Sequence, residues 1–251
     1  MLKNIRPITL KTKNLKTQGL IFNPIEDNSA KCCVFTHGYT SHKGSILTWA
    51  QKVIDLGAPC LLFDLPGHYL GNFHEVNEFN HFIEEVPQLF EKAFSIILEN
   101  NKYATKPIIG GHSLGALMAL KASNEFEMFK EIICVGLGSL PINKPHLFET
   151  PFFKDTMHLR SELVSECLNP KLMLPWISEQ KRQPITHNKS IHLIGGKDDI
   201  IIGGEEGINQ MGKTLQETNV VDIQLITKLP HHTPENAGIF IKKTLQQINS
   251  Y

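Results

Sequence analysis

The sequence has no excess of charge of either sign, because 25 lysines and arginines balance 25 aspartates and glutamates. Without a strong electrostatic field, we expect no binding to nucleic acid or to an anionic membrane surface. The chain also lacks an apolar run long enough to span a membrane, and residues 1–7 lack the apolar core of a signal peptide. These absences predict a cytoplasmic protein without a membrane span.

Patterns for disulfides, metals and cofactors are also missing. The five cysteines are odd in number and have no C-x-x-C spacing, which favours reduced, structural thiols. The twelve histidines, among them His68, His74 and His81, show no H-x-x-x-H or Cys/His ligand spacing, so no metal is expected. The segment Gly195-Gly196-Lys197 is followed by Asp198 and does not match a phosphate-binding loop. We therefore expect no cofactor.

What the chain does contain is an alternation of apolar strands and amphipathic helices. A length of 251 residues suits one large domain, 1–251. An antiparallel pair at the N-terminal edge, followed by alternating strands and helices, predicts an α/β fold with a doubly wound, mostly parallel sheet of about eight strands. Strands are expected near 8–10, 19–22, 32–36, 59–63, 106–110, 132–137, 191–194 and 221–226, and helices near 46–54, 75–98, 114–122, 205–216 and 234–248.

Two places interrupt this regular pattern. Pro87 lies in the long helical segment and is expected to kink or divide it. From residue 141 to about 188 the alternation stops, and prolines separate short amphipathic pieces. So long a segment without strands predicts an inserted helical cap after the sixth strand, at 141–188. Its apolar residues could wall a pocket, although we expect most of them to pack the cap onto the body.

The most informative motif in the sequence is Ile108-Ile109-Gly110-Gly111-His112-Ser113-Leu114-Gly115-Ala116. A strand ends here, a sharp turn follows, and good helix formers begin. In such a turn the central serine adopts a strained backbone conformation that lifts its hydroxyl clear of the sheet. Gly111 and Gly115 stand where a side chain would collide with neighbouring elements.

This pattern resembles the nucleophile elbow of the α/β-hydrolase superfamily. The resemblance covers the chain from about residue 31 to its C-terminus, apart from the cap, and implies an α/β-hydrolase fold with Ser113 as the catalytic nucleophile. A serine hydroxyl needs a histidine base, and the base needs an orienting carboxylate. In this superfamily the order along the chain is serine, acid, histidine.

The acid of the superfamily normally follows a late strand. Here the strand at 191–194 is followed by Gly195-Gly196-Lys197-Asp198-Asp199-Ile200-Ile201, which is similar to the superfamily's acid loop. Counting from Gly195 selects Asp198, and counting from Gly196 selects Asp199. Because the apolar part of the strand ends at Ile194, Asp198 is preferred and Asp199 is the alternative.

The resemblance places the base between the last strand and the last helix. Leu229-Pro230-His231-His232-Thr233 occupies that position. Relatives commonly have a glycine before the histidine, preceded by a small or apolar residue. With Pro230 in the glycine position, His231 fits better and His232 is the alternative.

An oxyanion hole is implied by two backbone N–H groups. Leu114 begins the helix after the elbow, so its N–H points to where an oxyanion would form. His37-Gly38-Tyr39-Thr40 resembles the His-Gly loop of the superfamily, which implies the N–H of Tyr39 as the second donor. The turn at 64–71 resembles another superfamily turn of structural role, from which Tyr69 and Gly71 depart.

These motifs predict a carboxylesterase that acts through an acyl-enzyme on a small-molecule acyl substrate. A serine at the elbow disfavours the branches of the superfamily that carry aspartate there. A thioesterase, a lactonase or a carbon–carbon bond hydrolase could use the same residues. A ligand-binding module without turnover is the alternative from another class. The sequence makes no prediction of the oligomeric state.

Overall fold

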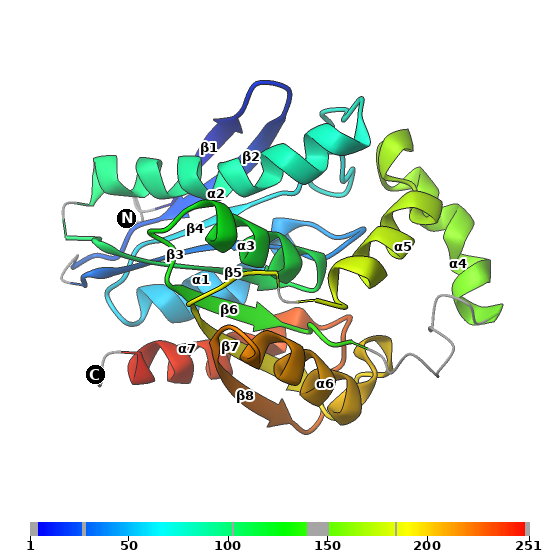
Figure 1. The fold of residues 1–251 in the computed structure, drawn as a ribbon. Helices are drawn as coiled ribbons and strands as arrows, with labels where there is room; N and C mark the ends of the chain where they lie inside the picture. Colours follow the sequence, from blue (N-terminus) through cyan, green and yellow to red (C-terminus); the bar gives the residue numbers. More distant parts are fainter. Residues whose placement is uncertain (1–4, 27–28, 102, 140–150, 184, 249–251) are drawn as a thin grey trace.

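An eight-stranded sheet forms the centre of the molecule in the computed structural model, which describes residues 5–26, 29–101, 103–139, 151–183 and 185–248 (Figure 1). The strand order is β1-β2-β4-β3-β5-β6-β7-β8. The pairs β1–β2 and β2–β4 are antiparallel and the other pairs are parallel. The predicted fold class and its antiparallel N-terminal edge are therefore confirmed. The strands are β1 (Ile5–Lys11), β2 (Lys16–Phe22), β3 (Lys31–Thr36), β4 (Cys60–Phe63), β5 (Lys106–His112), β6 (Glu131–Val135), β7 (Ser190–Gly196) and β8 (Val220–Ile226).

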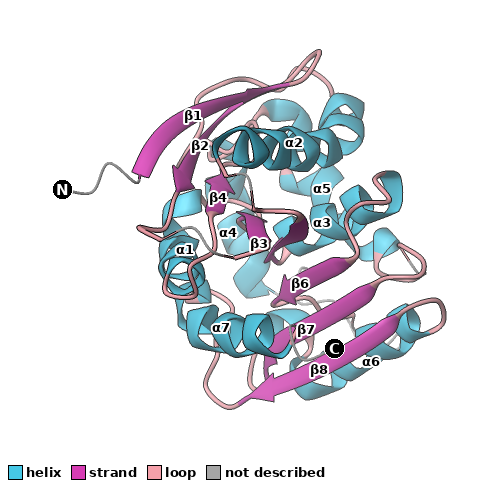
Figure 2. Ribbon diagram, turned by 90° about the vertical axis from the view of Figure 1, so that its left-hand side faces the viewer, coloured by secondary structure: helices cyan, strands magenta, loops and turns pink. Residues whose placement is uncertain are grey.

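Helices cover both faces of this sheet (Figure 2). The buried side chains of α2, α3 and α6 join one apolar core, and those of α1 and α7 join the core of the opposite face. Burial on both faces is what parallel strands require, and it explains why β3 and β4 are buried along their whole length. The helices are α1 (Leu47–Ile54), α2 (Phe79–Asn100), α3 (Leu114–Glu125), α4 (Pro151–Glu162), α5 (Pro170–Gln180), α6 (Gly204–Gln216) and α7 (Gly238–Gln247).

Helix α2 continues through its proline instead of dividing there. It spans 22 residues with Pro87 inside and begins at Phe79, later than the sequence pattern indicated. Phe82, Val86 and Phe90 on its inner face are fully buried. Tertiary packing of this face compensates for the backbone hydrogen bond that a proline cannot make.

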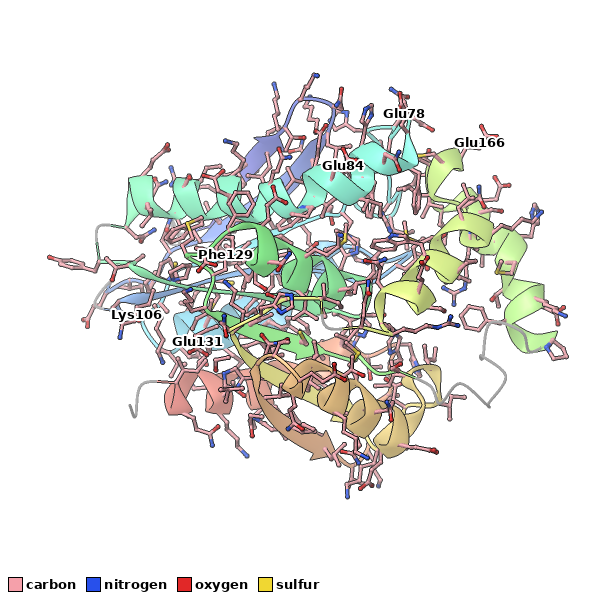
Figure 3. The ribbon with its side chains drawn as sticks, in the orientation of Figure 1. Glu78, Glu84, Lys106, Phe129, Glu131 and Glu166 are labelled. Atoms are coloured by element: carbon pink, nitrogen blue, oxygen red, sulfur yellow. The ribbon has the colours of Figure 1, made fainter. Side chains whose placement is uncertain are left out.

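Aromatic contacts close the core at the end of the sheet opposite the loops that carry the predicted site. Phe129 precedes β6 and is fully buried. Its ring meets those of Phe94 and Phe126 edge to face, at centroid distances of 6.2 and 6.0 Å. Figure 3 shows Phe129 beneath α2, with Lys106 and Glu131 at the start of their strands.

Helices α4 and α5 lie between β6 and β7 in the chain and project to one side of the sheet (Figure 1). They occupy the segment for which a cap was predicted, and residues 140–150 of that segment lie outside the described structure. Main-chain atoms attach the cap to the turn after β4. Tyr69 N donates to Leu163 O and Ser165 N donates to Gly67 O, both at 2.9 Å.

No helix in the described ranges has the length and apolar character needed to cross a membrane.

A buried tryptophan connects the fold to the segment that carries the two predicted histidines. Trp49 of α1 is fully buried, and its Nε1–H donates to Pro234 O at 2.7 Å. Replacing Trp49 with phenylalanine leaves this carbonyl without its donor and should lower the free energy of unfolding by about 1–3 kcal/mol. Urea denaturation measures the change. Trp176→Phe is the matched control, because its indole donates no hydrogen bond within the described residues and packs on Phe79 at the surface of the cap. Equal losses in the two variants would contradict the prediction.

Candidate active site

Ser113 lies in the turn between β5 and α3, with φ of 51° and ψ of −110°. A positive φ at a residue with a side chain is strained and persists only where the surroundings enforce it. Here Ser113 N donates to Val135 O at 2.8 Å, and Ser113 O accepts from Leu117 N at 3.1 Å. The turn is thus held by β6 on one side and by the first turn of α3 on the other.

The two glycines of this turn are required by main-chain contacts. A side chain at Gly111 would meet Gly115 C at 2.5 Å and Thr36 O at 2.6 Å. One at Gly115 would meet His37 O and Thr36 O, both at 2.6 Å. Backbone atoms cannot move aside as a flexible side chain can. The spacing of the glycines therefore reflects how closely the turn approaches the end of β3.

His231 pairs with an aspartate of the loop after β7. Its Nδ1 lies 2.9 Å from Asp199 Oδ2, and the two side chains are 14% and 2% exposed. The other carboxylate oxygen, Oδ1, accepts from Ile201 N at 3.1 Å. A carboxylate acceptor at Nδ1 places the proton on that nitrogen, so Nε2 keeps its lone pair.

The aspartate that pairs with His231 is Asp199, the alternative of the two sequence candidates, and not the preferred Asp198. Strand β7 does not stop at Ile194; it continues through Gly195 and Gly196, which pair with Leu225 and Ile226 of β8. The loop is thus counted from Gly196, and the buried carboxylate is that of Asp199, whereas Asp198 is exposed. For the histidine, the structure brings His231 to the aspartate and leaves His232 exposed.

The two predicted oxyanion donors lie at the ends of β3 and β5. Among the described residues, neither Tyr39 N nor Leu114 N has a hydrogen-bond acceptor. The loop that carries Tyr39 is held by His37, whose Nδ1 lies 2.8 Å from Gly38 O and whose Nε2 accepts from Leu65 N at 2.9 Å. Neither N–H group is therefore committed to an acceptor within the described structure.

His37 and its neighbour His68 are buried in the neutral form. Both side chains are fully buried, and this burial lowers the pKa of each to about 3. Their rings meet edge to face with centroids 5.5 Å apart. His68 Nδ1 lies 3.0 Å from Pro66 O, and its Nε2 is without a hydrogen-bond partner in the described structure. These histidines are part of the packing beneath the loop rather than proton donors in the site.

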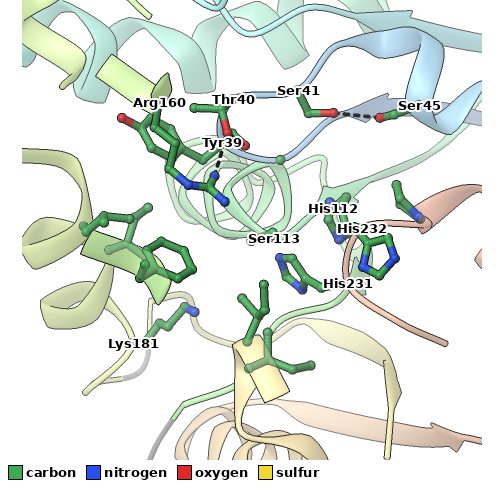
Figure 4. A pocket seen from close by; sticks show the side chains of 17 residues that line it. Tyr39, Thr40, Ser41, Ser45, His112, Ser113, Arg160, Lys181, His231 and His232 are labelled. Atoms are coloured by element: carbon green, nitrogen blue, oxygen red, sulfur yellow. Dashed lines mark hydrogen bonds between the residues drawn. The ribbon is translucent and has the colours of Figure 1, made fainter. Parts of the chain in front are cut away.

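A pocket of about 290 Å³ contains Ser113 and His231 together (Figure 4). The loops after β3, β5, β7 and β8 form its floor, and the cap forms its opposite wall. Of the apolar cap residues considered from sequence, Phe153, Leu174 and Ile177 face it. Met173 is buried in the core and Leu172 is half exposed, so these two pack or face solvent instead. Phe148 and the Phe152 side chain lie outside the described structure.

Several residues that line the pocket were not found by sequence reasoning, among them His112, Arg160 and Lys181. His112 is buried and stacks near His231, with ring centroids 4.5 Å apart. Burial lowers the pKa of His112 well below its ordinary value, and a hydrogen bond with the His231 backbone opposes this shift. Arg160 and Lys181 come from the cap. The elbow motif contains His112 and could have pointed to it, whereas no local pattern places Arg160 and Lys181 near Ser113.

In the described part of the chain, no three histidine, cysteine or carboxylate side chains gather as ligands of a metal ion would.

Comparison with known families gives a match that covers most of the chain. A family model described as "Serine aminopeptidase, S33" matches residues 27–205, which include the elbow, the His-Gly loop and the acid loop. The chain belongs to this S33 serine hydrolase family. The resemblance to α/β-hydrolases inferred from the sequence is thereby confirmed. A comparison with curated proteins finds no match.

Solved structures of esterases share the fold of this S33 chain. Est1E from Butyrivibrio proteoclasticus is 16% identical, with a TM-score of 0.60 and coverage of 98% of this chain and 99% of that one. A thermostable carboxyl esterase from Bacillus coagulans is 14% identical, with a TM-score of 0.71 and coverage of 98% and 97%. The Pf2001 esterase from Pyrococcus furiosus is 17% identical, with a TM-score of 0.60 and coverage of 97% and 90%.

The His231–Asp199 pair of this S33 chain leads to a test of the two aspartates. Asp199→Asn replaces the carboxylate that holds His231 with an amide, which can donate to Nδ1 and stabilise the wrong tautomer. We expect kcat for an ester to fall by about 10⁴-fold. Initial rates with p-nitrophenyl butyrate measure it.

Asp198→Asn is the matched control, because Asp198 is exposed and has no hydrogen bond in the described structure. Its kcat should stay within about twofold of the parent, as expected for a surface change. A large loss in Asp198→Asn with little loss in Asp199→Asn would restore the original preference.

The buried neutral histidines predict a loss of stability in acid. In the unfolded chain a histidine has a pKa near 6.5, so between pH 6.5 and 3 the unfolded state binds more protons than the native state. Each such group lowers the free energy of unfolding by about 1.4 kcal/mol per pH unit as the pH falls through this range. Thus His68→Phe should make the pH dependence between 6 and 4 shallower by about this amount. Urea unfolding at several pH values measures the slope, and an unchanged slope would contradict neutral burial of His68.

Proposed function

We propose that this protein is a serine hydrolase that cleaves carboxylic esters through an acyl-enzyme, with Ser113 as nucleophile, His231 as base and Asp199 as orienting acid. The observation that carries the proposal is the His231–Asp199 hydrogen bond in the pocket that Ser113 also lines. The strained backbone of Ser113 supports it, because such strain is typical of a nucleophile held for attack.

The proposed reaction begins with His231 Nε2, which accepts the proton of the Ser113 hydroxyl while Asp199 stabilises the imidazolium. Ser113 Oγ bonds to the ester carbon, and the carbonyl electron pair moves to its oxygen. That oxyanion accepts hydrogen bonds from the N–H groups of Tyr39 and Leu114, a contribution of about 3–4 kcal/mol for each donor in comparable sites. His231 then protonates the departing alkoxide. Water repeats the sequence and releases the acid.

Support for an ester substrate comes from the shape of the pocket and from the structural neighbours. The pocket has a volume of about 290 Å³ and an apolar wall formed by Phe153, Leu174 and Ile177, which suit a small acyl group. The Pf2001 esterase and the Bacillus coagulans carboxyl esterase, which share the fold, are named as esterases. A thioester, a lactone or a carbon–carbon bond could be cleaved by the same residues.

The description of the family raises aminopeptidase activity as a second candidate. An aminopeptidase must hold the free ammonium group of its peptide, and a carboxylate is the natural partner for it. None of the described residues that line the pocket is an aspartate or a glutamate, and two of them, Arg160 and Lys181, are cationic. This charge disfavours a peptide N-terminus, so the ester remains the preferred substrate.

The proposal predicts that Ser113→Ala loses turnover. With p-nitrophenyl butyrate we expect kcat to fall by at least about 10⁴-fold, since the remaining donors and binding contacts supply only residual catalysis. A fluorophosphonate probe should label the parent at Ser113 and leave the variant unlabelled.

Three outcomes would contradict this function. Equal ester hydrolysis by the parent and Ser113→Ala would exclude Ser113 as the nucleophile. Tight binding of an ester without turnover or labelling would identify a non-catalytic binding module. Hydrolysis of an aminoacyl p-nitroanilide faster than of the ester would favour the aminopeptidase instead.

A further inference from the structure

The cap places two cationic side chains over the proposed catalytic residues. Arg160 lies near the end of α4, and Lys181 is the residue that follows α5. Both line the pocket that contains Ser113. In Figure 4, Arg160 and Lys181 reach into this pocket from the side opposite the histidines. The proposed ester hydrolysis assigns neither residue a role.

Lys181 is the more unusual of the two because its ammonium group lacks a partner. The residue is only 8% exposed, yet among the described residues its Nζ makes no hydrogen bond and no ion pair. Burial lowers the pKa of Lys181 to about 8, and the charge of Asp199 opposes this shift from beyond ion-pair distance. Asp199 already binds His231 and Ile201 N. A cation on a largely buried side chain is costly to leave without a counter-charge, and an anionic ligand in the pocket that Lys181 lines would supply one.

Arg160 is held in place but keeps donors for a further partner. Its Nη1 donates to Thr40 Oγ1 at 2.9 Å, its Nε donates to Thr156 Oγ1 at 3.3 Å, and its guanidinium stacks on Phe153 at 4.7 Å. These contacts orient the planar group without neutralising it. A guanidinium has five N–H donors in a geometry that matches the two oxygens of a carboxylate or phosphate.

Carboxylates that could neutralise this pair lie elsewhere. The four acidic residues in the described part of the cap all have exposed side chains: Asp155, Glu162, Glu166 and Glu179. Figure 3 shows Glu166, together with Glu78 and Glu84 of the neighbouring segment, at the outer surface. The chain as a whole has no net charge. The positive charge of the pocket is therefore local to the cap wall.

We propose that the pocket selects substrates that carry a second, anionic group, which Lys181 and Arg160 bind while Ser113 attacks the ester. The proposal rests on the ester hydrolysis proposed above and names the substrate class. The group is a carboxylate or a phosphate, placed on the acyl half or on the alcohol half of the ester. It supplies the partner that Lys181 lacks and accepts the free donors of Arg160, whereas a neutral substrate leaves the buried ammonium unpaired.

Matched esters test which half carries the anion. For the acyl half, the mono-p-nitrophenyl ester of adipic acid is compared with p-nitrophenyl hexanoate and with the methyl ester of the same adipate. For the alcohol half, the butyrate esters of 4-hydroxybenzoate and of 4-hydroxyphenyl phosphate are compared with that of methyl 4-hydroxybenzoate. We expect kcat/KM to be about tenfold to a hundredfold higher for the anionic member of at least one set. No preference in either set would overturn the proposal.

Variants then assign the preference to the two cap residues. Lys181→Met keeps the length of the buried aliphatic side chain and removes its charge, and Arg160→Gln removes the guanidinium group. Each should lower kcat/KM for the preferred anionic ester at least about tenfold more than it lowers kcat/KM for the matched neutral ester. Lys171→Met and Arg182→Gln are the matched controls, because both residues are exposed on the same cap and are absent from the pocket. Controls that lose the preference as strongly would overturn the assignment, as would equal losses on charged and neutral esters.

Binding measured without turnover separates this proposal from the proposed function. The Ser113→Ala variant is titrated by calorimetry with adipate, 4-hydroxybenzoate and inorganic phosphate. We expect it to bind the anion whose ester the parent hydrolyses best. In the double variant Ser113→Ala/Lys181→Met, the affinity for that anion should be about tenfold lower. Binding that depends on Lys181, together with no ester turnover by the parent protein, would support the anion site and refute the esterase. Turnover of esters without binding of any of these anions would support the esterase and refute the anion site.

Discussion

The close approach of two stretches of main chain governs the structure around Ser113. The turn after β5 rests against the end of β3, and only glycine at positions 111 and 115 permits this contact. The same contact holds Ser113 next to the loop that carries Tyr39. This packing between backbones, together with the hydrogen bonds of the buried His37 side chain, fixes the position of Ser113 relative to the two N–H groups.

Around Ser113, neutral and charged side chains occupy different sides of the pocket. His37, His68 and His112 are buried as neutral rings beneath the site, so they add shape without adding charge. The negative charge of Asp199 stands behind His231, and the positive charges of the cap stand across the pocket. Such a separation of charge across a partly enclosed space favours a substrate with a matching polarity.

Sequence reasoning was sufficient where one local pattern carries the information. The strands, the elbow at Ser113 and the loop of His231 follow from apolar runs, glycine spacing and chain order. Which aspartate pairs with His231 depends on the length of β7, which pairing with β8 extends through two glycines of low strand propensity. The positions of Lys181 and Arg160 in the pocket could not be predicted, because they depend on how the cap packs on the body, and amphipathic helices alone do not specify that packing.

The attachment of the cap to the turn after β4 has an evolutionary consequence. Its hydrogen bonds join Tyr69 N to Leu163 O and Ser165 N to Gly67 O, and all four atoms belong to the main chain. Mutations that change the side chains of α4 and α5 leave these bonds available. The residues that face the substrate can therefore diversify while the anchor of the cap is inherited unchanged, which lets new specificities arise without rebuilding the catalytic body.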